Sequence, residues 1–449
     1  MENPHILVLP FPVQGHIMPL MELSQTLATH GCNITFVNIE TNHRLIAAAV
    51  SDDDVGLNPR IRLAFVPGKE ESFMKIGEVI TRSKLEDLIR QIENGDDDDD
   101  HHHHGPITGF VVDDAMGWAL ALGLEMGIKT AVFTPYPALT LFIISNIQKL
   151  IDDGIIDEEG NPLKETVEFS PTLPAFNVKD FIWRRFETAA VQKSIFNLFK
   201  DGMETAKLAQ WTIINTSRSI EPAALSLVPQ ARAIGPLIST NRLGSLMHAE
   251  LDASLKWLDQ QPPNSVIYAS FGSTTIFSHD QFHHLAIGLE LTNMPFLWVI
   301  RPGSVNGSEL DYPEGFLDRV GSRGKVVRWA PQEKVLGHPS VACFFTHCGW
   351  NSTIEAVSNG VPLVCWPYFG EQFMNQSYIC NVWRVGLGFE RKDEEIVSKE
   401  EIKEKIETLV SDKSFKDRAL ELKESTLASV KENGSSNKNL LDFIEWVRN

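Results

Sequence analysis

The chain has 449 residues, of which 43% are hydrophobic, and carries a formal net charge of −19. This length exceeds what one hydrophobic core organises and suits two domains of about 200 residues each. An acidic chain without basic clusters argues against nucleic acid or an anionic membrane surface as a partner, because both are bound through Lys and Arg.

No run of about 18 apolar residues occurs, so we expect no membrane span. The first residues lack a cationic start and a small-residue cleavage site, which favours a cytoplasmic protein, and we expect a monomer. Five widely spaced cysteines without a C-x-x-C pattern argue against a disulfide framework or a zinc site. They are typical of buried thiols in a reducing compartment.

Short apolar runs alternate with segments of helical period along the whole chain. In the first half we predict strands near Ile6–Leu9, Ile34–Val37, Ile61–Phe65, Gly109–Val112, Thr130–Phe133 and Trp211–Ile214. In the second half we predict them near Val266–Ser270, Phe296–Ile300, Val326–Arg328, Ala342–Thr346 and Leu363–Trp366. Nearly continuous apolar strands separated by helices indicate buried parallel sheets with right-handed crossovers. The expected fold is therefore α/β, with two doubly wound, Rossmann-like domains facing each other across a cleft.

The boundary between the two domains is expected after Gly235-Pro236-Leu237, where periodicity fades. This predicts a first domain over residues 1–240 and a second over 250–436. Within the second domain, Ser278 and Gln281 have capping-box spacing ahead of a helix reaching residue 292.

The end of the chain, residues 437–449, reads as an amphipathic helix that packs back on the first domain. Its apolar residues, at i, i+3, i+4 and i+7, are Leu440, Phe443, Ile444 and Val447. A different segment, Asp96–Asp100 followed by His101–His104, is interpreted as a solvated loop or an insertion. A metal-binding tract is the alternative for that segment.

The histidine that follows the first strand is a candidate general base. A glycine turn, Gly15, places His16 at the carboxyl end of Ile6–Leu9, and an imidazole with a pKa of about 6.5 suits a base at neutral pH. The strand ending at Val112 continues into Asp113 and Asp114, either of which could orient the imidazole. Packing or capping roles are the structural alternatives, and capping of the next helix fits Asp114 better.

The strongest motif lies between Trp329 and Gln372. The strand Ala342–Thr346 ends in His347-Cys348-Gly349, and a helix then begins at Trp350-Asn351-Ser352. A helix N-terminus offers free N–H groups and the positive end of its dipole, so it binds phosphate well.

Further side chains suit the other parts of a sugar nucleotide. Glu355, one turn into the helix, could accept hydrogen bonds from ribose hydroxyls, and Trp329 could stack on a base. Glu371 and Gln372 pair an acid with an amide, which suits a polyol. Taken alone, each residue more often has a structural role in core packing, in a helix cap or beside the helix dipole, and the weight lies in their joint spacing.

The segment from Trp329 to Gln372 resembles the signature box of plant family 1 UDP-glycosyltransferases, which have the GT-B fold. The resemblance rests on the opening Trp, the His-Cys-Gly-Trp-Asn-Ser core, Gly360-Val361-Pro362 and the closing acid–Gln pair. It implies a donor set made of Trp329, Ala330, Gln332, His347, Gly349, Trp350, Asn351, Ser352, Glu355, Glu371 and Gln372, with Ser273 and Thr140 as weaker additions. It also supports His16 as the base and, through the aspartate five residues before Trp118, selects Asp113.

The resemblance further implies transfer of glucose from UDP-glucose with inversion, giving a β-glucoside, without a metal or a resident cofactor. Glu371 stands where the family often has Asp, which leaves its contact open. Aromatic residues of the first half suggest an apolar acceptor pocket, namely Phe11, Phe73, Tyr136, Phe142 and Trp183. UDP-galactose is an alternative donor. An NAD-dependent oxidoreductase is disfavoured, because no G-x-G-x-x-G follows the first strand.

Overall fold

The computed structural model describes residues 3–51, 57–68, 79–94, 104–238, 248–306, 310–389 and 396–449. Its contacts divide the chain into two compact units, which are treated separately below. The first unit comprises Met1–Gly160, Glu187–Leu246 and Ala428–Asn449, and the second comprises Asn161–Phe186 and Met247–Leu427. The segment 161–186, which precedes the expected boundary at 240, is therefore grouped with the second unit.

A seven-stranded parallel sheet in the order β3-β2-β1-β4-β5-β8-β9 forms the first unit. Its strands are β1 (His5–Leu9), β2 (Asn33–Ile39), β3 (Ile61–Val66), β4 (Gly109–Asp113), β5 (Lys129–Thr134), β8 (Trp211–Ile214) and β9 (Ala231–Ala233). Every residue of β1 and β4 is buried, as expected for strands covered on both faces.

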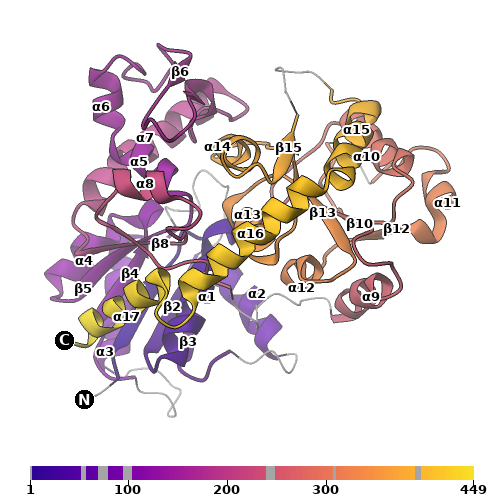
Figure 1. Cartoon of the computed structure of the whole chain (residues 1–449). Coiled ribbons are helices and arrows are strands. Elements are labelled where there is room, and N and C mark those ends of the chain that lie inside the picture. Colours follow the sequence, from indigo (N-terminus) through magenta and orange to yellow (C-terminus); the bar gives the residue numbers. More distant parts are fainter. Residues whose placement is uncertain are drawn as a thin grey trace. The chain divides into compact units, whose positions relative to one another are not determined.

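Helices connect and cover these strands (Figure 1). They are α1 (Gln14–Thr29), α2 (Glu40–Ser51), α3 (Arg82–Asn94), α4 (Ala119–Glu125), α5 (Ala138–Ser145), α6 (Ile147–Asp152), α7 (Ala189–Ala206), α8 (Pro222–Leu227) and the C-terminal α17 (Ser435–Arg448). The predicted apolar face of α17 is confirmed, since Leu440, Phe443, Ile444 and Val447 are buried in one core with β1 and β2.

The second unit contains a six-stranded parallel sheet in the order β12-β11-β10-β13-β14-β15. Its strands are β10 (Val266–Ser270), β11 (Phe296–Val299), β12 (Gly324–Val327), β13 (Val341–Thr346), β14 (Leu363–Cys365) and β15 (Gly386–Gly388), and an antiparallel pair is formed by β6 (Thr166–Val167) and β7 (Phe176–Asn177). Its helices are α9 (His248–Leu258), α10 (His279–Leu291), α11 (Phe316–Val320), α12 (Gln332–Leu336), α13 (Trp350–Asn359), α14 (Gln372–Ser377), α15 (Lys399–Ser411) and α16 (Lys413–Val430), the last of which continues into the first unit. The predicted cap of α10 is confirmed, because Ser278 Oγ accepts the Gln281 N–H at 3.2 Å.

The strand order decides where each sheet can bind a ligand. In both sheets the first strand lies between the second and the fourth of its series, so the direction of winding reverses beside it. Ligands of doubly wound sheets bind at this switch point, beyond the carboxyl ends of the strands. The two switch points are the β1/β4 edge of the first unit and the β10/β13 edge of the second.

The five cysteines are free, and four of them are buried. Burial raises the pKa of the Cys343 thiol to about 12 and that of the Cys365 thiol well above its usual range. These thiols are protonated at neutral pH and behave as small apolar side chains.

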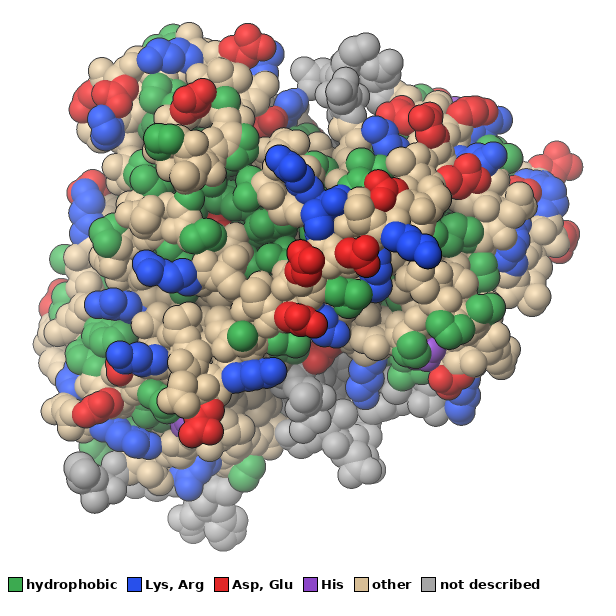
Figure 2. Space-filling model, viewed as in Figure 1, with side chains coloured by type: hydrophobic (Ala, Val, Ile, Leu, Met, Phe, Trp, Pro, Cys, Tyr) green, Lys and Arg blue, Asp and Glu red, His purple; other side chains and the backbone are tan. Residues whose placement is uncertain are grey.

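The surface of one face of the molecule carries Lys and Arg side chains interspersed with Asp and Glu (Figure 2). Among the described residues that are visible on this face, neither sign forms an extended patch. Among the described residues, no helix combines the length and the apolar character required to cross a membrane.

A fully buried carboxyl group holds the start of α5. Glu221 Oε2 accepts the Ala138 N–H at 2.9 Å and the Thr216 hydroxyl at 2.7 Å. Burial raises the pKa of Glu221 to about 7, above its usual value of 4.5, although these donors oppose the shift. Between pH 4.5 and about 7, Glu221 is therefore protonated in the folded chain, whereas the same carboxyl group has lost its proton in the unfolded chain.

This shift predicts a pH dependence of stability that Glu221→Gln removes. A raised pKa contributes stability below pH 4.5, and the contribution is lost as the pH rises through about 7. Relative to the parent, the variant should therefore gain free energy of unfolding between about pH 5 and 7, measured by urea denaturation. If the difference in free energy of unfolding between variant and parent stayed constant over this pH range, the raised pKa of Glu221 would be contradicted.

Candidate active site

The histidine and the aspartate predicted as a catalytic pair are hydrogen-bonded in the first unit. His16 lies in the first turn of α1, directly after β1, and Asp113 ends β4. Because β1 and β4 are neighbours, their carboxyl ends bring His16 Nδ1 within 2.9 Å of Asp113 Oδ2. The His16 side chain is 25% exposed, whereas Asp113 is fully buried.

This contact determines which ring nitrogen of His16 is available for proton transfer. A carboxylate only accepts hydrogen bonds, so Nδ1 carries the proton and donates it to Asp113. Nε2 is then the unprotonated ring nitrogen, which is the form that a general base requires. The edge of the Phe11 ring packs against the imidazole, with ring centroids 5.4 Å apart.

The adjacent Asp114 has a different environment. Its Oδ2 accepts the hydroxyl of Tyr136 and that of Thr134, the latter at 3.3 Å. Burial, followed by the negative charge of Asp113, raises the pKa of Asp114 to about 8. Asp114 is therefore protonated at neutral pH.

The structural alternative of capping, which in the sequence fits Asp114 better, belongs to Asp113 in the structure. Asp113 Oδ1 accepts the Ala115 N–H at 3.0 Å and so caps the short 3-10 helix Asp114–Met116. One carboxylate thus caps this helix and binds His16 with its two oxygens. The cap fixes the Asp113 side chain, and through it the imidazole.

The predicted phosphate-binding turn joins β13 to α13 in the second unit. Cys348, between His347 and the N-cap residue Gly349, has a left-handed backbone with φ of 65°, which is rare outside glycine. Its carbonyl oxygen accepts the Asn375 side-chain amide at 2.8 Å, which holds this conformation. Strained residues of this kind are enriched at ligand-binding sites.

The N-terminus of α13 already interacts with an acidic side chain. The Trp350 N–H, in the first turn, donates to Glu371 Oε1 at 3.3 Å. The Trp350 ring itself is buried and packs near Trp383, with ring centroids 6.3 Å apart. In this structure Trp350 therefore offers its backbone, rather than its ring, to the turn.

The imidazole of His347 is uncharged at neutral pH. Burial lowers its pKa to about 4, and the positive charge of Arg301 lowers it in the same direction. Arg301 follows β11 and donates its Nε–H to the Gly272 carbonyl at 3.2 Å, at the end of β10. The sequence interpretation did not include Arg301, although its place just beyond a predicted strand could have indicated it.

A hydrogen-bonded network connects the residues assigned to the nucleoside. Gln332 Nε2 donates to Ser352 Oγ at 2.9 Å and to Glu355 Oε2 at 3.0 Å. Gln332 Oε1 accepts the Tyr268 hydroxyl at 3.3 Å. The amide thereby fixes the Glu355 carboxylate, which suits a group that must meet two ribose hydroxyls at once.

The remaining predicted donor residues belong to the second unit, except Thr140, which belongs to the first. Gln372 is buried, and its Oε1 accepts the Tyr368 N–H at 2.8 Å and the Phe369 N–H at 3.1 Å. Trp329 and Ala330 follow β12, Asn351 is half-buried in α13, and Ser273 is exposed in the turn after β10. Thr140 belongs to the first unit, where it is fully buried in α5 without a hydrogen-bond partner for Oγ1 among the described residues.

The residues expected to bind the acceptor are separated. Phe11 and Tyr136 are buried in the first unit, and Phe142 is half-buried in α5. Trp183 belongs to the second unit, where it is fully buried against Phe181 with ring centroids 5.4 Å apart. Phe73 lies outside the described residues, as do Asp96–Asp100 and three of the four histidines after them.

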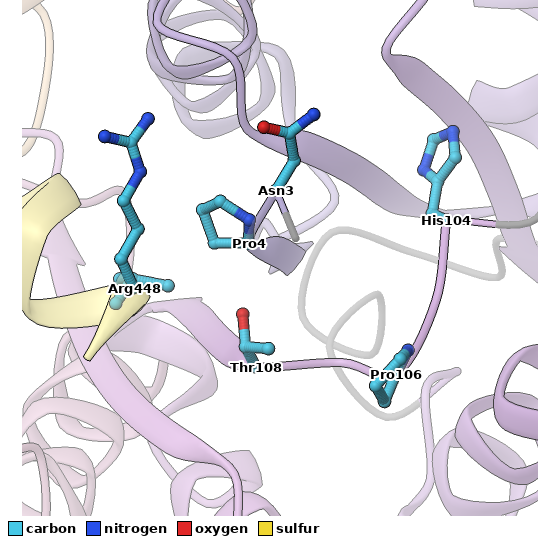
Figure 3. Close-up of a pocket in the computed structure, with 7 residues that line it drawn as sticks. Asn3, Pro4, His104, Pro106, Thr108 and Arg448 are labelled. Carbon is cyan, nitrogen blue, oxygen red and sulfur yellow. The ribbon is translucent and has the colours of Figure 1, made fainter. Parts of the chain in front are cut away.

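A pocket of about 240 Å³ lies at the opposite edge of the first sheet (Figure 3). It is lined by Asn3, Pro4, His104, Pro106, Thr108, Val447 and Arg448. These residues precede β1 and β4 or end α17, so the pocket is at the amino ends of the strands. Doubly wound sheets bind ligands at the other ends, and the pocket is not assigned to the active site.

Comparison with known proteins identifies similar sequences over the full length. The family described as UDP-glucoronosyl and UDP-glucosyl transferase matches residues 192–428, which include the whole segment from Trp329 to Gln372. UDP-glycosyltransferase 83A1 of Arabidopsis thaliana is 38% identical over 472 residues, which cover 100% of this chain and 97% of that relative.

Two solved structures are similar in fold over nearly the whole chain. A UDP-glucosyltransferase from Polygonum tinctorium, capable of glucosylating indoxyl, has a TM-score of 0.85 at 28% identity and covers 100% of both chains. UGT2 of Phytolacca americana, complexed with UDP-2fluoro-glucose and pterostilbene, has a TM-score of 0.83 at 26% identity and covers 99% of both. The predicted GT-B type of α/β fold is thereby confirmed.

Proposed function

Because the chain belongs to the UDP-glucoronosyl and UDP-glucosyl transferase family, and is thus a UDP-glycosyltransferase, we propose that it transfers glucose from UDP-glucose to a small acceptor. The acceptor group is a hydroxyl or a carboxyl on an apolar or phenolic molecule, and the product is a β-glucoside. The observation that carries this proposal is the 2.9 Å hydrogen bond between His16 and Asp113 at the switch point of the first sheet.

The proposed reaction is a single displacement at the anomeric carbon. His16 Nε2 takes the proton of the acceptor hydroxyl while its oxygen forms a bond to that carbon. The bond between the carbon and the diphosphate oxygen breaks, and UDP leaves with the electron pair. Asp113 positions the imidazole and stabilises the imidazolium that forms. One displacement inverts the α-configuration of the donor.

The leaving diphosphate is proposed to interact with three groups of the second unit. The N-terminus of α13 provides backbone N–H groups and the positive end of a helix dipole. His347, being neutral, donates an N–H rather than a charge. Arg301 provides the cationic charge.

Glucose is proposed as the sugar because Gln372 and Trp350 resemble the residues of glucose-using members of the family, and because the Phytolacca americana structure was obtained with UDP-2fluoro-glucose. Pterostilbene in that complex is a small, largely apolar phenolic, which supports the proposed acceptor class. UDP-galactose stays the alternative donor, because galactose differs from glucose only in the configuration of one hydroxyl group.

The proposal is tested by incubating the purified chain with UDP-glucose or UDP-galactose and a panel of phenolic, terpenoid and carboxylic acceptors. Mass spectrometry of the products is expected to show hexosides formed faster from UDP-glucose, and proton NMR a β-anomeric linkage. Faster reaction with UDP-galactose would contradict the donor, and an α-linkage would contradict the single displacement. Donor hydrolysis at equal rates with and without every acceptor would contradict transfer to a small molecule.

A further inference from the structure

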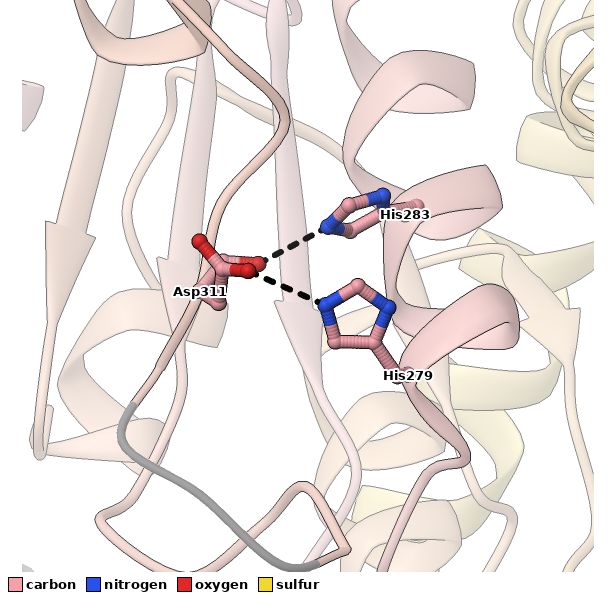
Figure 4. A group of neighbouring side chains, drawn as sticks. All are labelled: His279, His283 and Asp311. Atoms are coloured by element: carbon pink, nitrogen blue, oxygen red, sulfur yellow. Dashed lines mark hydrogen bonds and ion pairs between the residues drawn. The ribbon is translucent and has the colours of Figure 1, made fainter.

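Two histidines and an aspartate gather on the surface of the second unit, and none of them is a predicted donor residue. His279 and His283 are four residues apart in α10 and therefore lie on one face of the helix. Both rings point toward Asp311, which belongs to the segment between β11 and α11 (Figure 4). His279 Nε2 lies 3.2 Å from Asp311 Oδ2, and His283 Nε2 lies 2.9 Å from the Asp311 carbonyl oxygen.

These separations are those of ligand atoms around one metal ion. In a tetrahedral zinc site with bonds of about 2.0–2.1 Å, neighbouring ligand atoms are about 3.3 Å apart. One nitrogen or oxygen atom from each of the three residues lies within 4.8 Å of the others. An ion that replaces the two imidazole protons facing Asp311 would contact both rings and the carboxylate with small side-chain movements.

Residues next to the three ligands are held by a helix cap, by burial and by ring stacking. Ser278 caps α10 just before His279, and Phe282, next to His283, is fully buried. Tyr312, next to Asp311, stacks on Phe316 with ring centroids 5.7 Å apart and an angle of 6° between the rings. Rigid supports reduce the conformational entropy that a ligand set loses when it binds an ion.

We propose that His279, His283 and Asp311 bind a first-row transition metal ion of the zinc type, with the Asp311 carbonyl oxygen or water as the fourth ligand. Two imidazoles and one carboxylate suit Zn²⁺, whereas Mg²⁺ and Ca²⁺ prefer oxygen ligands alone. The side chains of His279 and Asp311 are 43% and 70% exposed, so an ion reaches them directly from solvent. The ion would connect α10 to the segment after β11 and stabilise the second unit, without entering the transfer reaction.

The test must separate this site from the four consecutive histidines at 101–104, which would also bind zinc. All measurements therefore use the full chain with His101–His104 replaced by asparagine. Zinc affinity is measured by competition with a coloured chelator, and the thermal midpoint of unfolding is recorded with and without zinc. Replacement by Co²⁺ adds a visible absorption spectrum that reports four-coordinate geometry.

The expected result is one zinc ion per chain and a higher thermal midpoint with zinc. Losing a direct ligand should weaken binding at least as much as losing an outer-shell partner, about 10–100-fold. His279→Ala and His283→Ala should therefore lower zinc affinity by this factor or more and abolish the thermal shift. His338→Ala is the matched control, because His338 Nε2 lies at the same 3.2 Å from Asp259 Oδ1 but belongs to no such group among the residues that the structure describes.

Absence of zinc binding in the asparagine background would overturn the proposal. Binding that persists unchanged in His279→Ala and His283→Ala would overturn it as well. Circular dichroism and UDP affinity of the two variants are expected to match those of the parent, which distinguishes a lost ligand from a misfolded second unit.

Discussion

Replacing His16 with alanine is expected to lower kcat/KM for glucosyl transfer by about 10²–10⁴-fold, the usual contribution of a general base. The variant loses the group that is proposed to accept the acceptor proton, whereas the residues proposed to bind UDP belong to the second unit. Affinity for UDP, measured by calorimetry, should therefore stay close to that of the parent.

The control for this prediction is His30→Ala, which removes the histidine at the other end of α1. His30 Nδ1 lies 2.9 Å from the Thr26 carbonyl oxygen on the exposed surface, so its loss should leave the transfer rate near that of the parent. If His16→Ala weakened UDP binding as much as it slowed transfer, His16 would have a structural role and the proposed mechanism would be wrong.

The strands of both sheets could be predicted because they are nearly continuous apolar runs bounded by polar residues, and all eleven predicted strands are present within about two residues. Two strands of these sheets were not predicted, β9 and β15, and each has three residues and lies at a sheet edge. Gly386–Gly388 contains two glycines and no apolar alternation. Such short strands exist through pairing with a neighbour, which no local pattern reports.

The grouping of residues 161–186 could not be predicted for a related reason. This segment is attached by contacts with residues far along the chain, such as Phe176, whose ring centroid lies 6.2 Å from that of Tyr378. These two residues are too far apart in the sequence for a local pattern of apolar residues to indicate their contact. Contacts of this kind follow from the packed structure alone.

The choice between Asp113 and Asp114 illustrates what a motif leaves open. The two residues are identical in type and adjacent at a strand end, where successive side chains point to opposite faces. The structure directs Asp113 to His16 and Asp114 to Tyr136. The pattern predicted that an acid meets His16, and the resemblance selected the correct one, but the burial that protonates Asp114 depends on three-dimensional packing.

Gly349→Ala is expected to weaken UDP binding by about 5–150-fold, because the added methyl group would displace His347. A Cβ atom on Gly349 would lie 2.6 Å from His347 Nε2, closer than real Cβ contacts allow. The backbone itself tolerates alanine, since φ of Gly349 is −57°. Overpacking of this kind costs about 1–3 kcal/mol, which corresponds to that range of affinity.

The control for this steric reasoning is Gly337→Ala, in the same unit. Its added Cβ would lie 3.4 Å from Asn359 Oδ1, an ordinary contact, and φ of Gly337 is −75°. UDP affinity of this variant, measured by calorimetry beside that of Gly349→Ala, should equal that of the parent.

A double-mutant cycle separates the clash from any other effect of the methyl group. His347→Ala removes the ring, so adding Gly349→Ala in that background should cause little further loss of UDP affinity. Gly272 is a contrasting case. A Cβ atom on Gly272 would also lie close to His347 Nε2, at 2.5 Å, but the backbone φ of +74° strains any side chain there even without the ring. Gly272→Ala should therefore stay harmful without the ring. Equal losses from Gly349→Ala in both backgrounds would show that His347 does not fill the space between these two glycines, and the proposed diphosphate site would lose its neutral donor.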